Sequence, residues 1–160
     1  MKQVQKQSRV EVVVDASVRQ VWDVVSDVTR IGEWSHECHT AQWLGGADGP
    51  SPGVRFRGRN RAGWARWGRT CEILSVDPPS QIVWRTVPTL LFPDSTQWRI
   101  ELEPAGDGRT LIRQSFAVLR APWLLDRIYA RLIPAHQDRD PRLAQDLARV
   151  GMAARRGARA

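Results

Sequence analysis

Four consecutive residues, His36 to His39, form the densest group of potentially reactive side chains in the 160-residue chain. Two imidazoles, a carboxylate and a thiol are ligand types that zinc accepts, but a tetrahedral site needs suitably spaced donors, and this spacing is not that of a zinc finger. His136 is the only other histidine. We therefore predict no metal site and no cofactor, and we expect the group to lie in a loop or at the rim of a cavity.

Two residues of this group are candidates for catalysis. Glu37 could act as a general acid or base, or orient a ligand hydroxyl, if it faces a cavity. We favour the alternative, an exposed carboxylate near Arg30 or an arginine of a sheet, because acidic side chains are mostly exposed. Cys38 would need a base beside it to act as a nucleophile, and His36 shares its face only in an extended chain. Enzymatic activity is therefore left open.

Arginine provides most of the positive charge. The chain has 24 lysine and arginine residues, 17 acidic residues and a formal charge of +7. Every second residue from 55 to 61 is arginine, so a strand over this segment places these guanidinium groups on one face. With Arg66 nearby, this face could bind RNA or an anionic surface, but Phe56 lies on the opposite face and could not stack on the same bases. We favour a solvated face paired with glutamates of neighbouring strands, and we do not expect a nucleic-acid partner.

The elements that position these residues follow from the spacing of apolar side chains. A period of two predicts strands, which are separated by breaks rich in glycine, proline and aspartate. Asp15 or Ser17 can cap a helix that runs to about Ser26, and Asp27 can cap a second short helix through Glu33. The predicted strands cover residues 10–14 with a start near residue 4, then 40–44, 54–61, 67–76, 81–87, 96–103 and 110–118.

The C-terminal segment returns to a helical period after Pro122, which suits the first position of a helix. Pro134 is expected to stop or kink this helix, because proline lacks a backbone donor and clashes with the preceding turn. Pro141 is the expected restart. We predict one domain over residues 1–153 and a basic, frayed tail over residues 154–160.

This order of elements predicts an α+β fold. A curved antiparallel sheet of about six to seven strands has one apolar face, which must be buried against the C-terminal helix. A strongly curved sheet wrapped on a helix leaves an internal space. The two short helices that follow the first strand are expected to close one end of it.

Several motifs resemble those of a known superfamily. They are Val21-Trp22-Asp23, the segments 27–35 and 53–61, Trp84 and the segment 98–104. Together with the element order, they resemble the START-like or SRPBCC superfamily, which has the helix-grip fold, and within it the polyketide cyclase/dehydrase-like branch of actinobacterial type. The preference for arginine over lysine also suits a GC-rich genome. The chain departs from the pattern at His36, where relatives tend to have proline, and at Pro134 and Pro141, which interrupt the last helix.

The resemblance implies a deep, largely apolar cavity between the sheet and the C-terminal helix. In this superfamily such a cavity holds lipids, sterols, polyketides or plant hormones. Alternate residues of each strand point to the same face of the sheet, and this alternation predicts which side chains face the cavity. Thr86 is at one of these inward-facing positions. The predicted lining residues are Phe56, Asn60, Trp67, Arg69, Cys71, Trp84, Trp98, Ile112, Gln114 and Phe116. We also expect the tryptophans at positions 34, 43, 64, 67, 84, 98 and 123 to lie mostly in the core or the cavity wall.

The direction of Arg69 depends on the regularity of its strand. In a regular strand Arg69 shares the inward face with Trp67 and Cys71, whereas a bulge near Gly68 would turn it outward. An inward guanidinium would need a carboxylate partner or an anionic ligand. If it faces the cavity, Arg69 could orient a ligand together with Asn60 or Gln114.

We therefore predict that the protein binds a small hydrophobic ligand that is lipid, polyketide-like or aromatic. The alternative is an enzyme of polyketide cyclase, aromatase or dehydratase type, and a third interpretation is an RNA- or anionic-surface-binding module. The first nine residues lack the apolar core of a secretion signal, and no apolar stretch approaches the roughly 20 residues of a membrane span. Cys38 and Cys71 are too few for a disulfide framework. A cytoplasmic location is expected.

Overall fold

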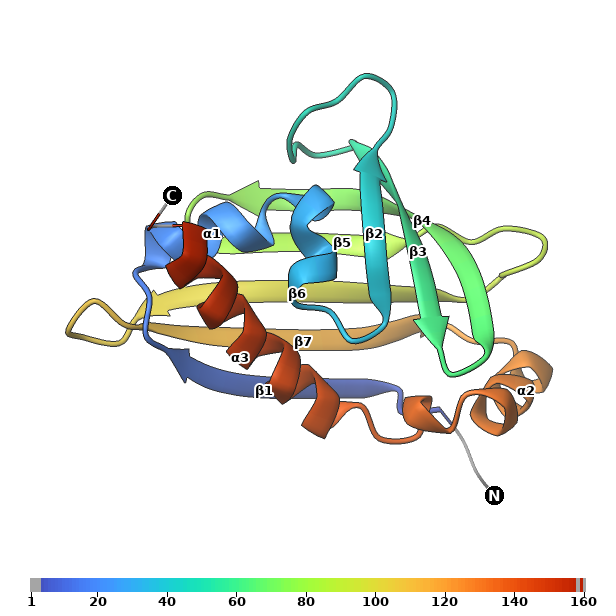
Figure 1. The fold of residues 1–160 in the computed structure, drawn as a ribbon. Coiled ribbons are helices and arrows are strands. Elements are labelled where there is room, and N and C mark those ends of the chain that lie inside the picture. Colours follow the sequence, from blue (N-terminus) through green and yellow to red (C-terminus); the bar gives the residue numbers. More distant parts are fainter. Residues whose placement is uncertain (1–3, 158, 160) are drawn as a thin grey trace.

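The computed structural model describes residues 4–157 and 159. Its centre is one seven-stranded antiparallel sheet with the strand order β1-β7-β6-β5-β4-β3-β2, and helix α3 lies across one face of this sheet (Figure 1). The strands are β1 (Gln7–Val14), β2 (Cys38–Trp43), β3 (Arg55–Ala62), β4 (Ala65–Asp77), β5 (Gln81–Thr86), β6 (Ser95–Pro104) and β7 (Thr110–Arg120). The helices are α1 (Val18–Val25), the 3₁₀-helix η1 (Val28–Glu33), α2 (Trp123–Leu132), the 3₁₀-helix η2 (Pro134–His136) and α3 (Asp140–Gly157). The predicted α+β helix-grip architecture is confirmed.

Both short helices after β1 begin at side-chain caps. Ser17 accepts a hydrogen bond from the backbone N–H of Gln20 at 3.2 Å, and the Gln20 side chain accepts one from the Ser17 backbone at 2.8 Å, which forms a capping box. Of the two predicted caps, Ser17 is therefore the one used. Asp27 accepts from the backbone N–H of Thr29 at 3.0 Å and starts η1. These caps fix the residues at which the two helices begin.

The C-terminal helical region is divided in two. Helix α2 ends at Leu132, the short turn η2 begins at Pro134, and α3 starts at Asp140 directly before Pro141. The division follows from the prolines, since each lacks the N–H that would continue the helical hydrogen-bond ladder. In the part of the chain that is described, no helix is long and apolar enough to cross a membrane.

Helix α3 extends beyond the expected end of the domain. It continues to Gly157, and Ala153 and Ala154 are buried in it. The boundary expected at residue 153 therefore lies inside a packed helix. Residues 158 and 160 of the expected tail lie outside the described residues.

The register of β4 decides where its side chains point. β3 and β4 pair without interruption over the whole of β3, so no bulge lies at Gly68. The irregularity of β4 lies between Ile73 and Ser75, where it pairs with β5. Arg69 consequently keeps its inward direction and is 9% exposed.

The apolar core lies where α1 and the later part of α3 pack against the sheet. Val21, Leu147 and Val150 have no exposed surface. Helix and sheet approach closely at Gly151, where an added Cβ atom would lie 2.6 Å from the Cβ of Val14. This glycine therefore allows α3 to lie directly on β1.

Apolar side chains of α2 depart from the expectation that they belong to the core. Trp123 at the start of α2 is 70% exposed, and Leu124, Ile128 and Leu132 also face solvent. Trp64, in the turn between β3 and β4, lies at the rim of a cavity and is 79% exposed. The side chains of α2 are exposed because this helix lies at one end of the sheet rather than across its apolar face (Figure 1).

Candidate functional site

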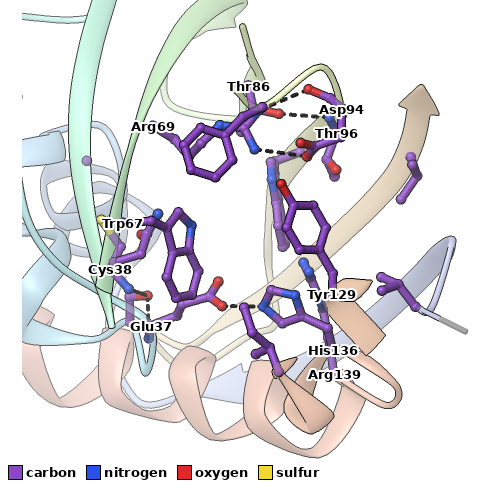
Figure 2. A pocket seen from close by; sticks show the side chains of 18 of the residues that line it. Glu37, Cys38, Trp67, Arg69, Thr86, Asp94, Thr96, Tyr129, His136 and Arg139 are labelled. Carbon is purple, nitrogen blue, oxygen red and sulfur yellow. Dashed lines mark hydrogen bonds and ion pairs between the residues drawn. The ribbon is translucent and has the colours of Figure 1, made fainter. Parts of the chain in front are cut away.

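A cavity of about 350 Å³ lies between the inner face of the sheet and the segment that contains α2, η2 and the start of α3. Side chains of sheet, loop and helix meet around it in Figure 2. From α3, only Leu143 and Asp146 reach the cavity, because the later turns of this helix pack on the sheet itself. The volume falls within the range of small-molecule sites, about 300–1,000 Å³.

Most of the predicted lining residues form the wall of this cavity. On the inward face of the β3–β4 pair, Phe56 lies opposite Cys71 and Asn60 lies opposite Trp67. The predicted residues that line the cavity are Phe56, Asn60, Trp67, Arg69, Cys71, Trp84, Trp98 and Gln114, and Thr86 joins them. Strand parity therefore identified side chains of β3 to β6, and Gln114 of β7, that line the space.

The other two predicted lining residues, both on β7, do not reach the cavity. Ile112 has no exposed surface and belongs to the packed core beneath α3. Phe116 lies behind Trp98, with ring centres 5.0 Å apart, and supports the wall without forming it. The prediction that they line the cavity is therefore corrected: parity gives the face of the sheet, but α3 fills part of that face.

Arg69 lies in the cavity wall and has a carboxylate partner. It donates to Oδ2 of Asp94 at 2.9 Å and to the backbone carbonyl of Asp94 at 3.0 Å. Its guanidinium also lies 5.3 Å from the ring centre of Phe92. This ion pair compensates the cost of burying the charge and ties β4 to the loop before β6 (Figure 2).

A second arginine, Arg139, lies in the wall with fewer partners. Its guanidinium carbon is 5.8 Å from the Trp98 ring centre and 5.3 Å from that of Phe116, and burial lowers its pKa. Among the described residues, neither Nε of Arg139 nor Oε1 of Gln114 has a hydrogen-bond partner. The same is true of Nε1 of Trp34, Nε of Arg69 and Oδ1 of Asp94 elsewhere in the wall.

Glu37 forms a hydrogen bond with Nε2 of His136 in the cavity wall (Figure 2). Burial opposes ionisation of Glu37, but the hydrogen bond and charge of His136, with the charges of Arg139 and His36, outweigh it and lower the pKa of Glu37 to about 2. The expectation of an exposed carboxylate is wrong. A carboxyl group with this pKa is ionised at neutral pH, so it cannot donate a proton and is a weak base.

The remaining residues of the reactive group point to separate partners. Nδ1 of His36 lies 2.6 Å from Oδ2 of Asp146, and Arg149 donates to Oδ1 of the same carboxylate at 3.0 Å. Burial raises the pKa of Asp146, against the opposing effect of these partners. Within the described residues, no three histidine, cysteine or acidic side chains are placed to hold a metal ion.

Both cysteines are held as neutral thiols. Burial and the charge of Glu37 raise the pKa of Cys38 to about 11, and burial raises that of Cys71 to about 12. The thiolate is the nucleophilic form, so neither side chain is activated for attack at neutral pH. The raised pKa of Cys38 therefore disfavours nucleophilic catalysis by this residue.

The arginine face of β3 lies on the opposite side of the sheet from the cavity. Its four arginines are exposed, as their alternation with inward residues requires. Arg55 pairs with Glu72 at 3.1 Å, and Arg57 donates to the hydroxyl of Thr70 at 3.3 Å. This agrees with a solvated outer face that is partly paired across strands.

Several residues of the site were not identified from the sequence. Asp94 lies in a loop, and His136 and Arg139 lie between two helices, where neither period of apolar side chains applies. Tyr129 reaches the cavity from the inward face of α2. The available signal was chemical type, since His136 is the only histidine outside the 36–39 group.

The fold and the enclosed site define a helix-grip protein with an internal ligand cavity. The chain belongs to the polyketide cyclase / dehydrase and lipid transport family, whose model matches residues 5–136. No curated protein matches the chain significantly in sequence.

Solved structures share this fold at low sequence identity. The Zhui aromatase/cyclase from Streptomyces sp. R1128 is 18% identical, with a TM-score of 0.72 and 95% of each chain covered. Protein NE0264 from Nitrosomonas europaea is 11% identical, with a TM-score of 0.67 and 97% of each chain covered. The di-domain ARO/CYC StfQ from the steffimycin biosynthetic pathway is 16% identical, with a TM-score of 0.66 over 95% of this chain and 46% of that chain. At these identities the similarity establishes the fold, and the ligand must be argued from the cavity.

Proposed function

We propose that the protein binds a small hydrophobic molecule that carries a polar oxygen, and that it does so in the internal cavity. The observation that carries this proposal is a mainly apolar cavity, open at one end, whose unsatisfied polar atoms include a donor on Arg139 and an acceptor on Gln114. Apolar burial would supply most of the affinity, at about 25 cal/mol per Å² of surface removed from water. The two polar groups would fix the direction of the ligand.

The aromatic part of the wall favours a ligand with flat or chain-like apolar portions. Trp84 and Trp98 stack with ring centres 6.4 Å apart and an interplanar angle of 13°. Trp67 of β4 also lines the cavity and is in edge contact with His136, with ring centres 6.1 Å apart. Broad ring faces of this kind bind apolar rings and acyl chains with little loss of side-chain entropy.

The polar groups select a functional group of the ligand. Arg139 is suited to a carbonyl or carboxylate oxygen, and Gln114 Oε1 to a hydroxyl that donates. Arg69 has a reduced role in this proposal, because Asp94 already accepts two of its hydrogen bonds. A hydroxylated or carboxylated lipid or polyketide-like molecule fits both requirements.

Binding can be tested with two tryptophan substitutions on adjacent residues of β3. Asn60 points into the cavity and Arg59 points to solvent. We expect Asn60→Trp to fill the cavity and to weaken binding of the fluorescent probe 1-anilinonaphthalene-8-sulfonate about tenfold or more, while Arg59→Trp leaves binding unchanged. Probe titration, with native mass spectrometry of the gently purified protein, measures this difference.

The outcomes distinguish binding in the cavity from nonspecific binding elsewhere on the protein. Equal probe affinity in the two variants, or a wild-type protein that neither retains nor takes up a hydrophobic molecule, would contradict the proposal. A second variant, Arg139→Met, tests orientation: it should weaken binding of a long-chain fatty acid more than binding of the corresponding alcohol. An equal effect on both ligands would mean that Arg139 does not contact the polar group of the ligand.

An enzyme of cyclase, aromatase or dehydratase type is the second candidate, and the hydrogen bond between Glu37 and His136 favours it. A carboxylate that holds an imidazole in one orientation is a common arrangement for proton transfer. In this case Glu37 would position His136, which would exchange the proton. Cyclisation of a polyketide-like thioester should then be lost in His136→Ala and reduced in Glu37→Gln, whereas equal activity in all three proteins would exclude the pair.

Three further expectations stay predictions. They are the single-domain organisation, the cytoplasmic location and the third interpretation, in which the arginine face of β3 binds RNA or an anionic surface. For that face, binding should weaken steeply with increasing salt.

A further inference from the structure

Exposed apolar side chains are concentrated at one end of the molecule. Among the described residues, all the large hydrophobic side chains that are exposed, except Val13 and Met152, lie on three segments: the β3–β4 turn, the β5–β6 loop, and the end of β7 with α2. They are Trp64, Leu90, Leu91, Leu119, Trp123, Leu124, Ile128 and Leu132. We call these residues the mouth-end surface.

The topology of the sheet brings the three segments together. In the antiparallel order, the end of β3, the start of β4, the end of β5, the start of β6 and the end of β7 all lie at the same end of the sheet. Ser95 at the start of β6 pairs with Arg120 at the end of β7, directly before α2. Figure 1 shows the β5–β6 loop, the β3–β4 turn and α2 projecting at this end.

Helix α2 has an outward face that is both apolar and basic. Its exposed side chains are Trp123, Leu124, Arg127, Ile128, Arg131 and Leu132. Leu124, Ile128 and Leu132 recur every four residues and form one stripe, and the two arginines form the adjacent stripe. The only acidic residue of α2, Asp126, is turned inward and pairs with Lys6 at 2.5 Å. This is the pattern of a helix that lies in the plane of a lipid interface.

The cavity opens at the same end. Among its lining residues, the exposed ones are Lys6, Trp64, Arg66 and Leu132, which belong to the chain segment before β1, the β3–β4 turn, the start of β4 and α2. Trp64 and Leu132 are therefore part of both the rim and the mouth-end surface. Leu90, in the β5–β6 loop at the same end of the sheet, is fully exposed.

We propose that the mouth-end surface docks on an anionic lipid bilayer, with its leucine, isoleucine and tryptophan side chains in the interface and the neighbouring arginines of β7 and α2 against the lipid headgroups. Arg120, Arg127 and Arg131 give this end a positive charge, and Asp94 and Asp126 are withdrawn into pairs with Arg69 and Lys6. Apolar tips and a basic stripe together fit the two layers of an anionic membrane surface. The site differs from the arginine face of β3, which lacks exposed apolar side chains.

Docking in this orientation places the cavity mouth against the bilayer. A hydrophobic molecule could then pass between lipid and cavity without crossing water, which removes the cost of hydrating its apolar surface. The docking itself does not require a cavity ligand. Failure of vesicle binding would therefore leave the proposed ligand binding intact, and the reverse also holds.

The test is co-sedimentation with vesicles of phosphatidylcholine alone and of phosphatidylcholine mixed with phosphatidylglycerol. We expect the full-length protein to bind the anionic vesicles and to bind them more weakly in high salt, with little binding to the neutral ones. The double variant Leu124→Glu/Ile128→Glu should lose about tenfold or more in vesicle affinity. The matched control Val13→Glu/Met152→Glu changes two equally exposed apolar residues outside the mouth-end surface and should bind as the wild type does.

Several results would overturn the proposal. They are the absence of binding to anionic vesicles, equal losses in the two double variants, or a wild-type oligomer that only the α2 variant dissociates, which would make the surface a protein interface. Unchanged circular dichroism and melting temperature show that each variant is folded. Because the substituted α2 residues face solvent, a folding failure is not expected; if it occurs, Arg131→Gln, which should weaken vesicle binding and its salt dependence, provides the decisive comparison.

Discussion

At the α1 end of the sheet, side chains of α1 and α3 fill the concave face completely, whereas at the α2 end the same face encloses a cavity. Leu147 and Val150 of α3 have no exposed surface, but Leu125 of α2 contacts a space of about 350 Å³. The strands are continuous between the two ends, so the sheet does not cause the difference. What differs is the helix: α3 packs directly on the sheet at the first end, whereas α2 lies beyond the end of the sheet and does not cross its face.

Two sequence features cause this difference between α3 and α2. Gly151 lets α3 lie directly on β1, and the break between Pro134 and Asp140 moves α2 off the sheet. One chain thus combines a rigid half, which carries the stability, with a half whose apolar wall is available to a ligand. We expect substitutions at the packed end to act on folding and those at the hollow end to act on binding.

The largest difference is expected from equal truncations of two leucines. Leu147→Ala should lower the free energy of unfolding by about 2–5 kcal/mol, because it opens a cavity in a close-packed core. Leu125→Ala enlarges a space that already exists and should cost about 1 kcal/mol. Urea denaturation measures both values, and similar losses would mean that the two ends do not differ in packing.

Adding one methyl group at the packed end should also be costly. Gly151→Ala places its Cβ 2.6 Å from the Cβ of Val14, which cannot rotate away, so we expect a loss of about 1–3 kcal/mol in spite of the better helix propensity of alanine. Gly49→Ala is the control, since no atom lies within 4 Å of its added Cβ. Stabilisation by Gly151→Ala in thermal melts would show that α3 can move away from β1.

At the hollow end, the hydrogen bond between Glu37 and His136 predicts a pH effect. The folded-state pKa of Glu37 is about 2, below its ordinary value of 4.5, so the contact stabilises the protein above pH 4.5 and its contribution is lost as the pH falls from 4.5 towards 2. Glu37→Gln should remove about 1–3 kcal/mol at neutral pH and flatten this part of the profile. Parallel profiles for wild type and variant, in melts across this range, would contradict the pairing.

The smallest change in stability is expected at Gln114. Its Oε1 is buried without a partner, so Gln114→Met should alter the free energy of unfolding by about 1 kcal/mol or less, and can even raise it. Affinity for a hydroxylated ligand should fall nonetheless. A large loss of stability with unchanged ligand affinity would assign Gln114 to the packed half of the molecule.

The same division explains what the sequence could predict. Alternation identified the inward side of β3 and β4, including Phe56 and Cys71, because a period of two depends only on the backbone. It could not separate Ile112 from Trp98, since which part of the inward face stays open depends on where α3 crosses.

Long-range contacts were the second feature that could not be predicted from the sequence. Arg69 was recognised as needing a counter-charge, but its partner Asp94 lies in a loop with no periodic signal. Glu37 and His136 are 99 residues apart, and nothing in the pattern around either residue links them. The break at Pro134 was predictable, because a missing donor acts locally. Its effect on the position of α2 was not predictable, and Trp123 of that helix was expected in the core or the cavity wall.

The divided C-terminal region has a further consequence for the order in which parts of the molecule open. Few tertiary contacts hold the segment from α2 to His136, chief among them the Lys6–Asp126 ion pair and the Glu37–His136 hydrogen bond. By contrast, α3 is buried along β1 and would open only with global unfolding. The backbone amides of α2 should therefore exchange with deuterium as a separate low-energy unit, well before those of α3. A chain with one continuous helix would lack this two-step hierarchy.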